Sequence, residues 1–238
     1  KRVIMKKLLI ALFLVFGYVT SASAISGVNF GISITAGQFE ADGAKEEFTG
    51  AHVSSTSPGD VSKKASAEGD TAEALFGFGS IFIEKTLGDR LAIGVDYVPM
   101  TLDSETAENV QDNDDNPAAG KGTDQTNTVQ VDFSDLTTLY LTFALNDSMY
   151  VKAGLVEVDV ETNESLGTGG AYGNTTLDGT MLAIGYNRDL DTGAFVRLEA
   201  HTMDLDGVTL TNTNDSTKSI TADGFTGYGA KLSIGRSF

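Results

Sequence analysis

The 238-residue sequence contains no cysteine, no tryptophan and only three prolines. Without cysteine the chain can form neither a disulfide framework nor a lipid-modified cysteine anchor. Without tryptophan, any aromatic belt at a membrane surface has to be built from phenylalanine and tyrosine. These absences exclude the disulfide-rich and lipoprotein classes before any pattern is considered.

Long hydrophobic runs are also lacking. The longest apolar stretch, residues 8–19, is shorter than the roughly 18 residues that a transmembrane helix needs. Two lysines precede this stretch, and an Ala-x-Ala sequence ending at Ala24 follows it. This arrangement predicts a secretory signal peptide, cut after Ala24, in preference to a membrane anchor helix. Residues 1–4 precede Met5 and are interpreted as upstream read-through, so residues 25–238 are expected to form one mature domain.

Positive charge is scarce. Four of the 16 Lys and Arg residues fall within residues 1–24, so the expected mature chain has 12 of them against 33 Asp and Glu. A nucleic-acid partner is therefore not expected, because phosphate binding needs clustered cations. The mean hydropathy of −0.04 argues against a helical membrane protein. It is compatible with a membrane barrel, whose strands alternate between apolar and polar residues.

What the sequence does have is alternation. Eight segments alternate apolar with small or polar residues: 28–35, 74–85, 91–97, 136–145, 149–158, 180–189, 194–203 and 225–238. Three short turns join them in pairs, at Gly88-Asp89, Asn146-Asp147 and Asp191-Gly193. Four long polar stretches, 40–72, 101–128, 161–176 and 206–223, make the other connections. This regular alternation of short and long connections predicts an antiparallel meander.

A meander of eight strands has two edges, and closure into a barrel removes both. The sequence therefore predicts an all-β, closed, antiparallel up-and-down transmembrane barrel, with short periplasmic turns and long extracellular loops. An even strand number places both termini on the periplasmic side. A secreted β-sandwich is the alternative, but the faces opposite the apolar ones are rich in Gly, Ala, Ser and Thr. Such small residues fit the interior of an eight-stranded barrel.

The closing segment, "FTGYGAKLSIGRSF" at 225–238, ends on an aromatic residue. It resembles the C-terminal targeting signal of bacterial outer-membrane proteins: Lys231 and Phe238 match the usual pattern, whereas Ser233 and Arg236 depart from it. Across residues 25–238 the chain resembles the small eight-stranded barrels of the OmpA/OmpX/OmpW type. The resemblance implies Sec-dependent export to the outer membrane of a Gram-negative bacterium. It also implies periplasmic chaperones and the barrel-insertion machinery as partners in biogenesis, lipid and lipopolysaccharide as surroundings, and a monomer.

Five charged residues share the inward register near the periplasmic rim: Asp96, Lys152, Arg197, Glu199 and Lys231. Unpaired buried charges are costly, so they are expected to pair across the lumen. Glu199 is expected to bond to Lys231 or Arg197, its neighbours on the last two strands. Barrels similar to the OmpA type carry such a charged plug, which closes the lumen to solutes. The alternative is a selectivity ring in a narrow pore.

Aromatic residues near strand ends are the candidates for a membrane-interface girdle. Those expected to face outward are Tyr97, Tyr186, Tyr228 and Phe238. Each could also be an ordinary strand-favouring aromatic residue.

No catalytic, cofactor or metal site is expected. Of the two histidines, His52 lies in the first polar stretch, and His201 has Asp204 and Asp206 close in sequence but no serine at a recognisable spacing. The acidic segment "DNDDN", 112–116, offers oxygen ligands that divalent cations prefer, yet it lacks the glycine and distal glutamate of an EF-hand. A solvated loop with at most loosely bound cations is expected there.

The leading functional interpretation is a structural or surface-interaction role for a barrel with a plugged lumen. The alternative is a narrow porin-like channel or a transporter of small hydrophobic molecules. A third and weaker hypothesis is an outer-membrane enzyme centred on His201.

Overall fold

The computed structural model describes residues 27–48, 70–111, 125–167, 170–190, 192–214, 216 and 218–238. The expected signal peptide, His52 and the acidic segment 112–116 lie outside these residues. The described residues include no helix of the length and apolarity that crossing a membrane requires.

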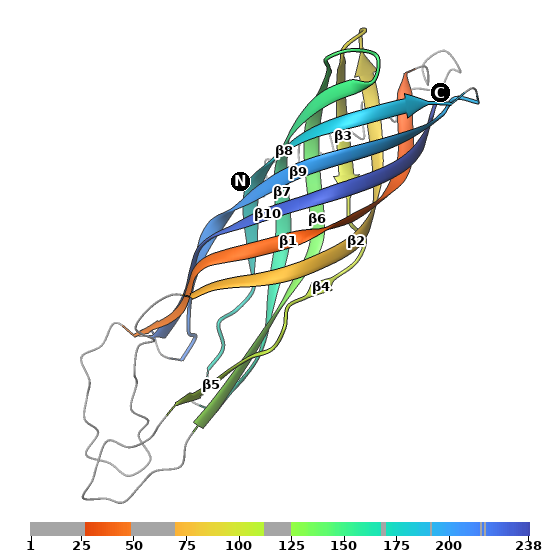
Figure 1. Ribbon diagram of the computed structural model, residues 1–238. Coiled ribbons are helices and arrows are strands. Elements are labelled where there is room, and N and C mark those ends of the chain that lie inside the picture. The colour runs from red at the N-terminus through yellow and green to blue at the C-terminus, as the bar shows by residue number, and fades with distance from the viewer. Residues whose placement is uncertain are drawn as a thin grey trace, which may run out of the picture.

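The described chain consists of strands, turns and loops (Figure 1). The ten strands are β1 (Val28–Phe48), β2 (Asp70–Leu87), β3 (Leu91–Tyr97), β4 (Leu102–Asp103), β5 (Ala107–Gln111), β6 (Gln125–Ala144), β7 (Met149–Leu166), β8 (Thr175–Asp189), β9 (Ala194–Thr211) and β10 (Lys218–Ser237).

These strands form one closed antiparallel sheet. Neighbours follow the order β3-β2-β1-β10-β9-β8-β7-β6, and β3 also pairs with β6, which completes the circle. β4 and β5 continue along β6 beyond β3, so the ten segments occupy eight positions. Where the last strand, β10, meets the first strand, β1, the backbone N–H of Phe238 donates to the carbonyl of Val28 at 2.9 Å. The predicted closed eight-stranded barrel is confirmed.

The barrel position occupied by β3, β4 and β5 is not one continuous strand. It is interrupted after β3 because Pro99 has no N–H to donate to a neighbouring strand. The facing strand β6 is irregular at the same height. Its register shifts between Ser134 and Thr137, and Asp135 takes a positive φ of 54°. The Tyr97 hydroxyl donates to the Asp135 carboxylate at 2.8 Å and so ties the end of β3 to this bulge.

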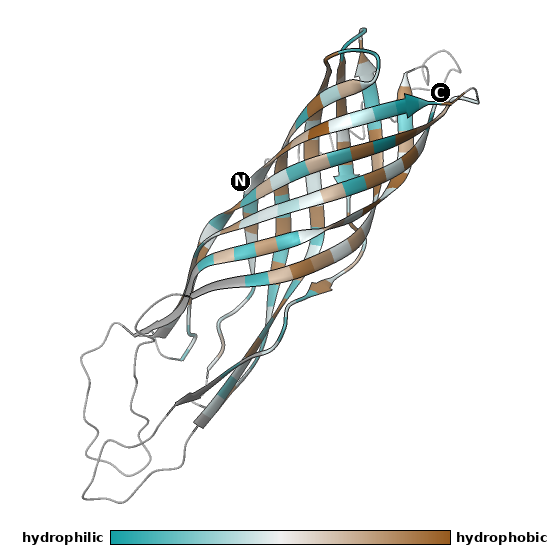
Figure 2. Cartoon of the chain, viewed as in Figure 1, coloured by the Kyte–Doolittle hydropathy of each residue, from teal (hydrophilic) through white to brown (hydrophobic). Residues whose placement is uncertain are grey.

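The barrel exterior is apolar over the half nearest the short turns, and Figure 2 shows apolar residues alternating with polar ones along the strands. Large apolar residues exposed on the outside include Phe30, Ile32, Ile34, Ile81, Leu141, Phe143, Leu155, Leu182, Ile184, Leu198, Leu232 and Ile234. In water this much exposed apolar surface would be an aggregation hazard. In a bilayer the same apolar surface would contact the hydrocarbon chains of the lipids.

The sequence predicted long loops for the four polar stretches, but parts of these stretches are strands in the structure. β1 runs on to Phe48, β7 to Leu166 and β9 to Thr211. Toward that end of the barrel the polarity of the two faces reverses: on β9, Asp204 is exposed while its neighbours Met203 and Leu205 are buried. A strand that leaves the apolar band meets water outside, so its polar residues turn outward.

We call the half of the barrel farther from the short turns the outer half. Its inward-facing apolar residues form the protein's hydrophobic core. The buried cluster consists of Phe78, Val98, Leu136, Tyr140, Val156, Val158, Val160, Leu177, Met181, Met203 and Leu205. The core therefore lies inside the barrel, and its side chains come from β2, β6, β7, β8 and β9 and from Val98.

Glycine makes this interior possible. Gly37 on β1 lies directly opposite Phe76 on β2 and faces inward, and a Cβ placed there would lie 2.6 Å from the ring atom Cζ of Phe76. Gly77, the residue after Phe76, faces outward, and the nearest atom to a Cβ there is the Thr35 carbonyl oxygen at 3.8 Å.

We therefore expect Gly37→Ala to destabilise the barrel by about 1–3 kcal/mol through overpacking. Gly77→Ala should be neutral or stabilise it by up to about 1 kcal/mol, because alanine restricts the unfolded chain. The temperature at which the folded, SDS-resistant barrel converts to unfolded gel mobility measures both effects. Equal shifts for the two variants would show that the assignment of inner and outer faces is wrong.

Candidate functional site in the barrel lumen

The charged residues that the sequence placed on the inward register do lie in the lumen. Asp96 comes from β3, Lys152 from β7, Arg197 and Glu199 from β9, and Lys231 from β10; their exposed fractions are low, 3% for Glu199 and 9% for Arg197. A sixth charge, Glu84 on β2, joins them and is 1% exposed. Sequence reasoning missed Glu84, although its even spacing from the inward Phe82 and Phe78 places it on the same face.

Three ion pairs neutralise these six charges. Arg197 donates from Nη1 and Nη2 to the two carboxylate oxygens of Glu84, at 3.1 and 2.9 Å. Lys231 Nζ donates to Asp96 Oδ2 at 2.9 Å. Lys152 is bonded to Glu199. The expected partners of Glu199 were therefore wrong. Lys231 is directly opposite Glu199 in the register, but it reaches Asp96 across the lumen, and Lys152 from β7 takes its place.

Amide side chains complete the deepest pair. Asn29 Nδ2 donates to Glu84 Oε1 at 2.9 Å, and Arg197 Nε donates to Asn187 Oδ1 at 3.1 Å. The guanidinium therefore uses three of its nitrogens on β2 and β8, and the fork geometry fixes both partners. Such bonds satisfy charges that would otherwise be buried at a cost of several kcal/mol each.

Aromatic rings separate the charges. The Lys152 ammonium lies 4.4 Å from the centroid of the Tyr140 ring, and the Arg197 guanidinium carbon lies 4.4 Å from that of Phe195 and 5.8 Å from that of Phe82. Cation–π attraction of this kind is worth about 2 kcal/mol or more when water is excluded. The rings also fill space around each pair.

Each of these rings, and that of Tyr150 near Arg197, lies directly opposite a glycine on a neighbouring strand. The register pairs Tyr140 with Gly94, Tyr150 with Gly185, Phe195 with Gly235 and Phe82 with Gly31. A Cβ at Gly31 would lie 2.7 Å from the Phe82 ring, and the other three glycines are at least as crowded. No sequence signal marks these pairs, because they depend on the register between strands.

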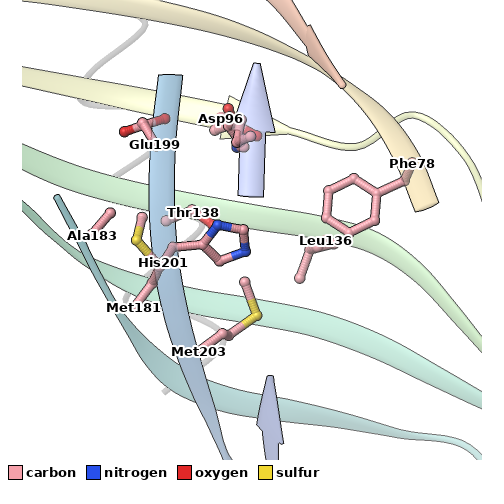
Figure 3. Close-up of a pocket in the computed structure, with 10 residues that line it drawn as sticks. Phe78, Asp96, Leu136, Thr138, Met181, Ala183, Glu199, His201 and Met203 are labelled. Carbon is pink, nitrogen blue, oxygen red and sulfur yellow. Dashed lines mark hydrogen bonds and ion pairs between the residues drawn. The ribbon is translucent and has the colours of Figure 1, made fainter. Parts of the chain in front are cut away.

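A small cavity of about 20 Å³ lies between the charges and the apolar core. Figure 3 shows its lining, in which Asp96 and Glu199 project from one side and Leu136, Met181 and Met203 from the other, with His201 between them. The volume is enough for about one water molecule.

The catalytic hypothesis for His201 loses its proposed partners. His201 faces inward and lines the cavity, whereas Asp204 and Asp206 are exposed on the outer face of β9. Odd sequence spacing along a strand places residues on opposite faces. The described residues also contain no group of three or more His, Cys, Asp or Glu side chains that could hold a metal ion.

The four candidate girdle residues face outward at two heights. Tyr186 and Phe238 are 50% and 53% exposed near the short turns, and Tyr228 is 55% exposed farther along β10. Tyr97 is partly exposed at the end of β3, beside the Asp135 bulge.

Comparison with known proteins finds similarity of architecture. No protein-family profile and no curated protein sequence matches the chain. Among solved structures, the outer membrane protein OprG from Pseudomonas aeruginosa is 11% identical, with a TM-score of 0.42 and coverage of 87% of this chain and 96% of that one. The outer membrane protease OmpT from Escherichia coli is 11% identical, with a TM-score of 0.37 and coverage of 89% and 96%. A Pseudomonas aeruginosa FadL homologue is 9% identical, with a TM-score of 0.30 and 89% coverage of both chains. At these identities the likeness concerns the fold of outer-membrane barrels and not the activity of any of them.

The pairing in the lumen makes a specific prediction. Glu199→Gln leaves the Lys152 ammonium buried without its anion, so we expect a loss of about 3–5 kcal/mol in barrel stability. Adding Lys152→Met should recover most of that loss, whereas adding Arg197→Met should not, because Arg197 is bonded to Glu84. Heat-dependent gel mobility of single and double variants measures the coupling.

Glu73→Gln is the matched control, since Glu73 is exposed and a surface change of this kind is typically worth less than about 0.5 kcal/mol. Rescue by Arg197→Met and none by Lys152→Met would contradict the pairing described here.

Proposed function

We propose that this protein is an integral outer-membrane barrel whose lumen is closed and whose role is structural or in surface interaction. The observation that carries the proposal is the filled lumen, in which three buried ion pairs lie beneath a buried apolar cluster. An ion crossing the barrel would have to break the pairs and then pass through the apolar layer. Either step alone costs several kcal/mol.

The dimensions of the apolar band support a membrane location. Tyr228 and Phe238 lie ten residues apart on the outer face of β10, which is about 33 Å along a strand. With a strand tilt of about 40° this corresponds to about 25 Å along the barrel axis, the height of the apolar band in outer-membrane barrels. Tyr186 and Phe238 would then mark the periplasmic interface, and Tyr97 and Tyr228 the outer one.

Two features of the end of the chain support the targeting proposal. β10 is hydrogen-bonded to β1 up to its last residues and carries Phe238 outward, beside the Arg236 guanidinium at 5.6 Å. Lys231 faces the lumen, where it is bonded to Asp96. We infer that Lys231 and Phe238 belong to a signal read by the insertion machinery before folding, after export by the Sec pathway, and that the folded protein is a monomer.

The acidic exterior of the outer half supports a role at the cell surface. Carboxylates on the outer faces of the strands there include Glu40, Glu73, Asp132, Asp178, Asp204 and Asp206. A surface of one sign repels anionic partners and attracts cationic ones over about a Debye length. Divalent cations are therefore expected to bind loosely here, where they could bridge the carboxylates to the anionic groups of the surrounding lipopolysaccharide.

A second candidate function, transport of small hydrophobic molecules, is favoured by one observation: the outer half of the lumen is apolar. It requires the core cluster to open. Faster naphthalene uptake by cells that express the barrel than by cells that lack it would favour this candidate over a closed structural barrel.

Planar-bilayer recording tests the closed lumen. We expect the folded wild-type barrel to produce no discrete, reproducible openings, because the charged and the apolar layers block the same path. Glu84→Ala combined with Arg197→Ala removes one of the three ion pairs and keeps the apolar cluster, so this variant should also remain closed. Reproducible openings in the wild type would replace the proposed role with that of a narrow channel.

Accessibility of inserted tags tests the orientation. An epitope inserted between Gly173 and Asn174, in the loop joining β7 and β8, should be detected by antibody on intact cells. The same epitope inserted between Asn146 and Asp147, in the turn joining β6 and β7, should be detected only after the outer membrane is permeabilised. The reverse pattern would place the short turns outside.

A further inference from the structure

Two methionines and a histidine meet in the lumen, where none of them takes part in the three ion pairs. Met181 on β8 and Met203 on β9 are directly paired in the register, and both are buried. His201 precedes Met203 by two residues and so shares its inward face. All three line the cavity of about 20 Å³ (Figure 3).

The His201 imidazole is held in this position by packing. It lies over Gly229 of β10, where a Cβ would be 2.7 Å from Cε1 and 2.8 Å from Nε2 of the ring. Among the described residues, neither imidazole nitrogen has a hydrogen-bond partner. A half-buried imidazole with an available nitrogen, next to two thioethers, provides three potential ligands for a metal ion.

We propose that Met181, Met203 and His201 form a binding site for a soft monovalent cation, Cu(I) or its redox-stable analogue Ag(I). Thioether sulfur and neutral imidazole are ligands that favour Cu(I), which does not need a high coordination number. The cavity accommodates one ion without its hydration shell. Cross-strand and diagonal neighbours on one face lie within reach of each other's long side chains, so three ligands can converge on one point.

The surrounding charge favours a soft ion over a hard one. The three ion pairs of the lumen sum to zero formal charge, so a hard divalent cation gains little electrostatic attraction in exchange for losing its water. A soft monovalent ion gains its binding energy from sulfur and nitrogen, and it brings only one charge into the lumen.

The chain provides its own matched controls. The expected mature sequence has four methionines, and the other two, Met100 and Met149, are 46% and 39% exposed near strand ends. Methionine and leucine have similar volumes, so Met→Leu at any of the four positions should leave the barrel folded.

The experiment uses the folded barrel, purified in detergent and chloride-free buffer, and silver nitrate as the probe. After removal of free silver, the wild type should retain one silver ion per chain, and the temperature of gel-mobility conversion should rise, because the ion binds the folded state. Met181→Leu and Met203→Leu should each weaken silver binding at least about tenfold, since even an outer-shell partner of a ligand is typically worth 10- to 100-fold. Met100→Leu and Met149→Leu should bind silver as the wild type does.

Methyl NMR of methionine-labelled protein distinguishes the lumen site from surface binding. The Met181 and Met203 methyl signals should shift with silver, and those of Met100 and Met149 should not. His201→Gln should reduce affinity while both methyl signals still shift at higher silver concentration. Absence of retained silver would overturn the proposal, as would unchanged binding in the Met181→Leu, Met203→Leu double variant. Shifts confined to Met100 and Met149 would show surface binding only and would overturn it equally.

Discussion

Closure of eight strands into a barrel leaves an interior only wide enough for side chains, and the rest of the structure adapts to that limit. The glycines opposite Tyr140, Tyr150, Phe195 and Phe82 allow large rings inside a narrow wall. The rings in turn lie against the buried cations. The six charges in this space are largely buried and form three ion pairs, since an unpaired buried charge is costly.

The surroundings of the barrel's outer face differ along its length, and the polarity of the side chains on each face differs accordingly. In the half near the short turns the outside is apolar and the inside holds charges. In the outer half the outside is acidic, and the inside is a conventional hydrophobic core. The same strands serve both halves, so a residue's polarity indicates its face only when its height along the barrel is known. Asp204 and Glu199 are both acidic residues of β9, yet one faces water and the other faces Lys152.

Much of the fold follows from the sequence because it depends on local pattern. Period-two alternation and turn residues such as Gly88 locate the strand cores, and the number of short turns determines the strand count and the side on which both termini lie. The inward register of Asp96, Lys152, Arg197, Glu199 and Lys231 could be derived by counting along each strand. The extent of the outer strand segments could not, because a polar stretch looks the same whether it is a loop or a strand with its polar face in water.

The sequence by itself determined which residues share a face, since that depends only on odd or even spacing along one strand. Only the tertiary structure decided which residues meet, since that depends on register and on reach across the lumen. Lys231 is directly opposite Glu199 in the register, but its ammonium is bonded to Asp96, and Arg197 crosses to Glu84. Met181 and His201 are 20 positions apart in the sequence, but the pairing of β8 with β9 places both in the lining of one cavity. A closed barrel creates these contacts because side chains from strands that are not neighbours project into the same narrow interior.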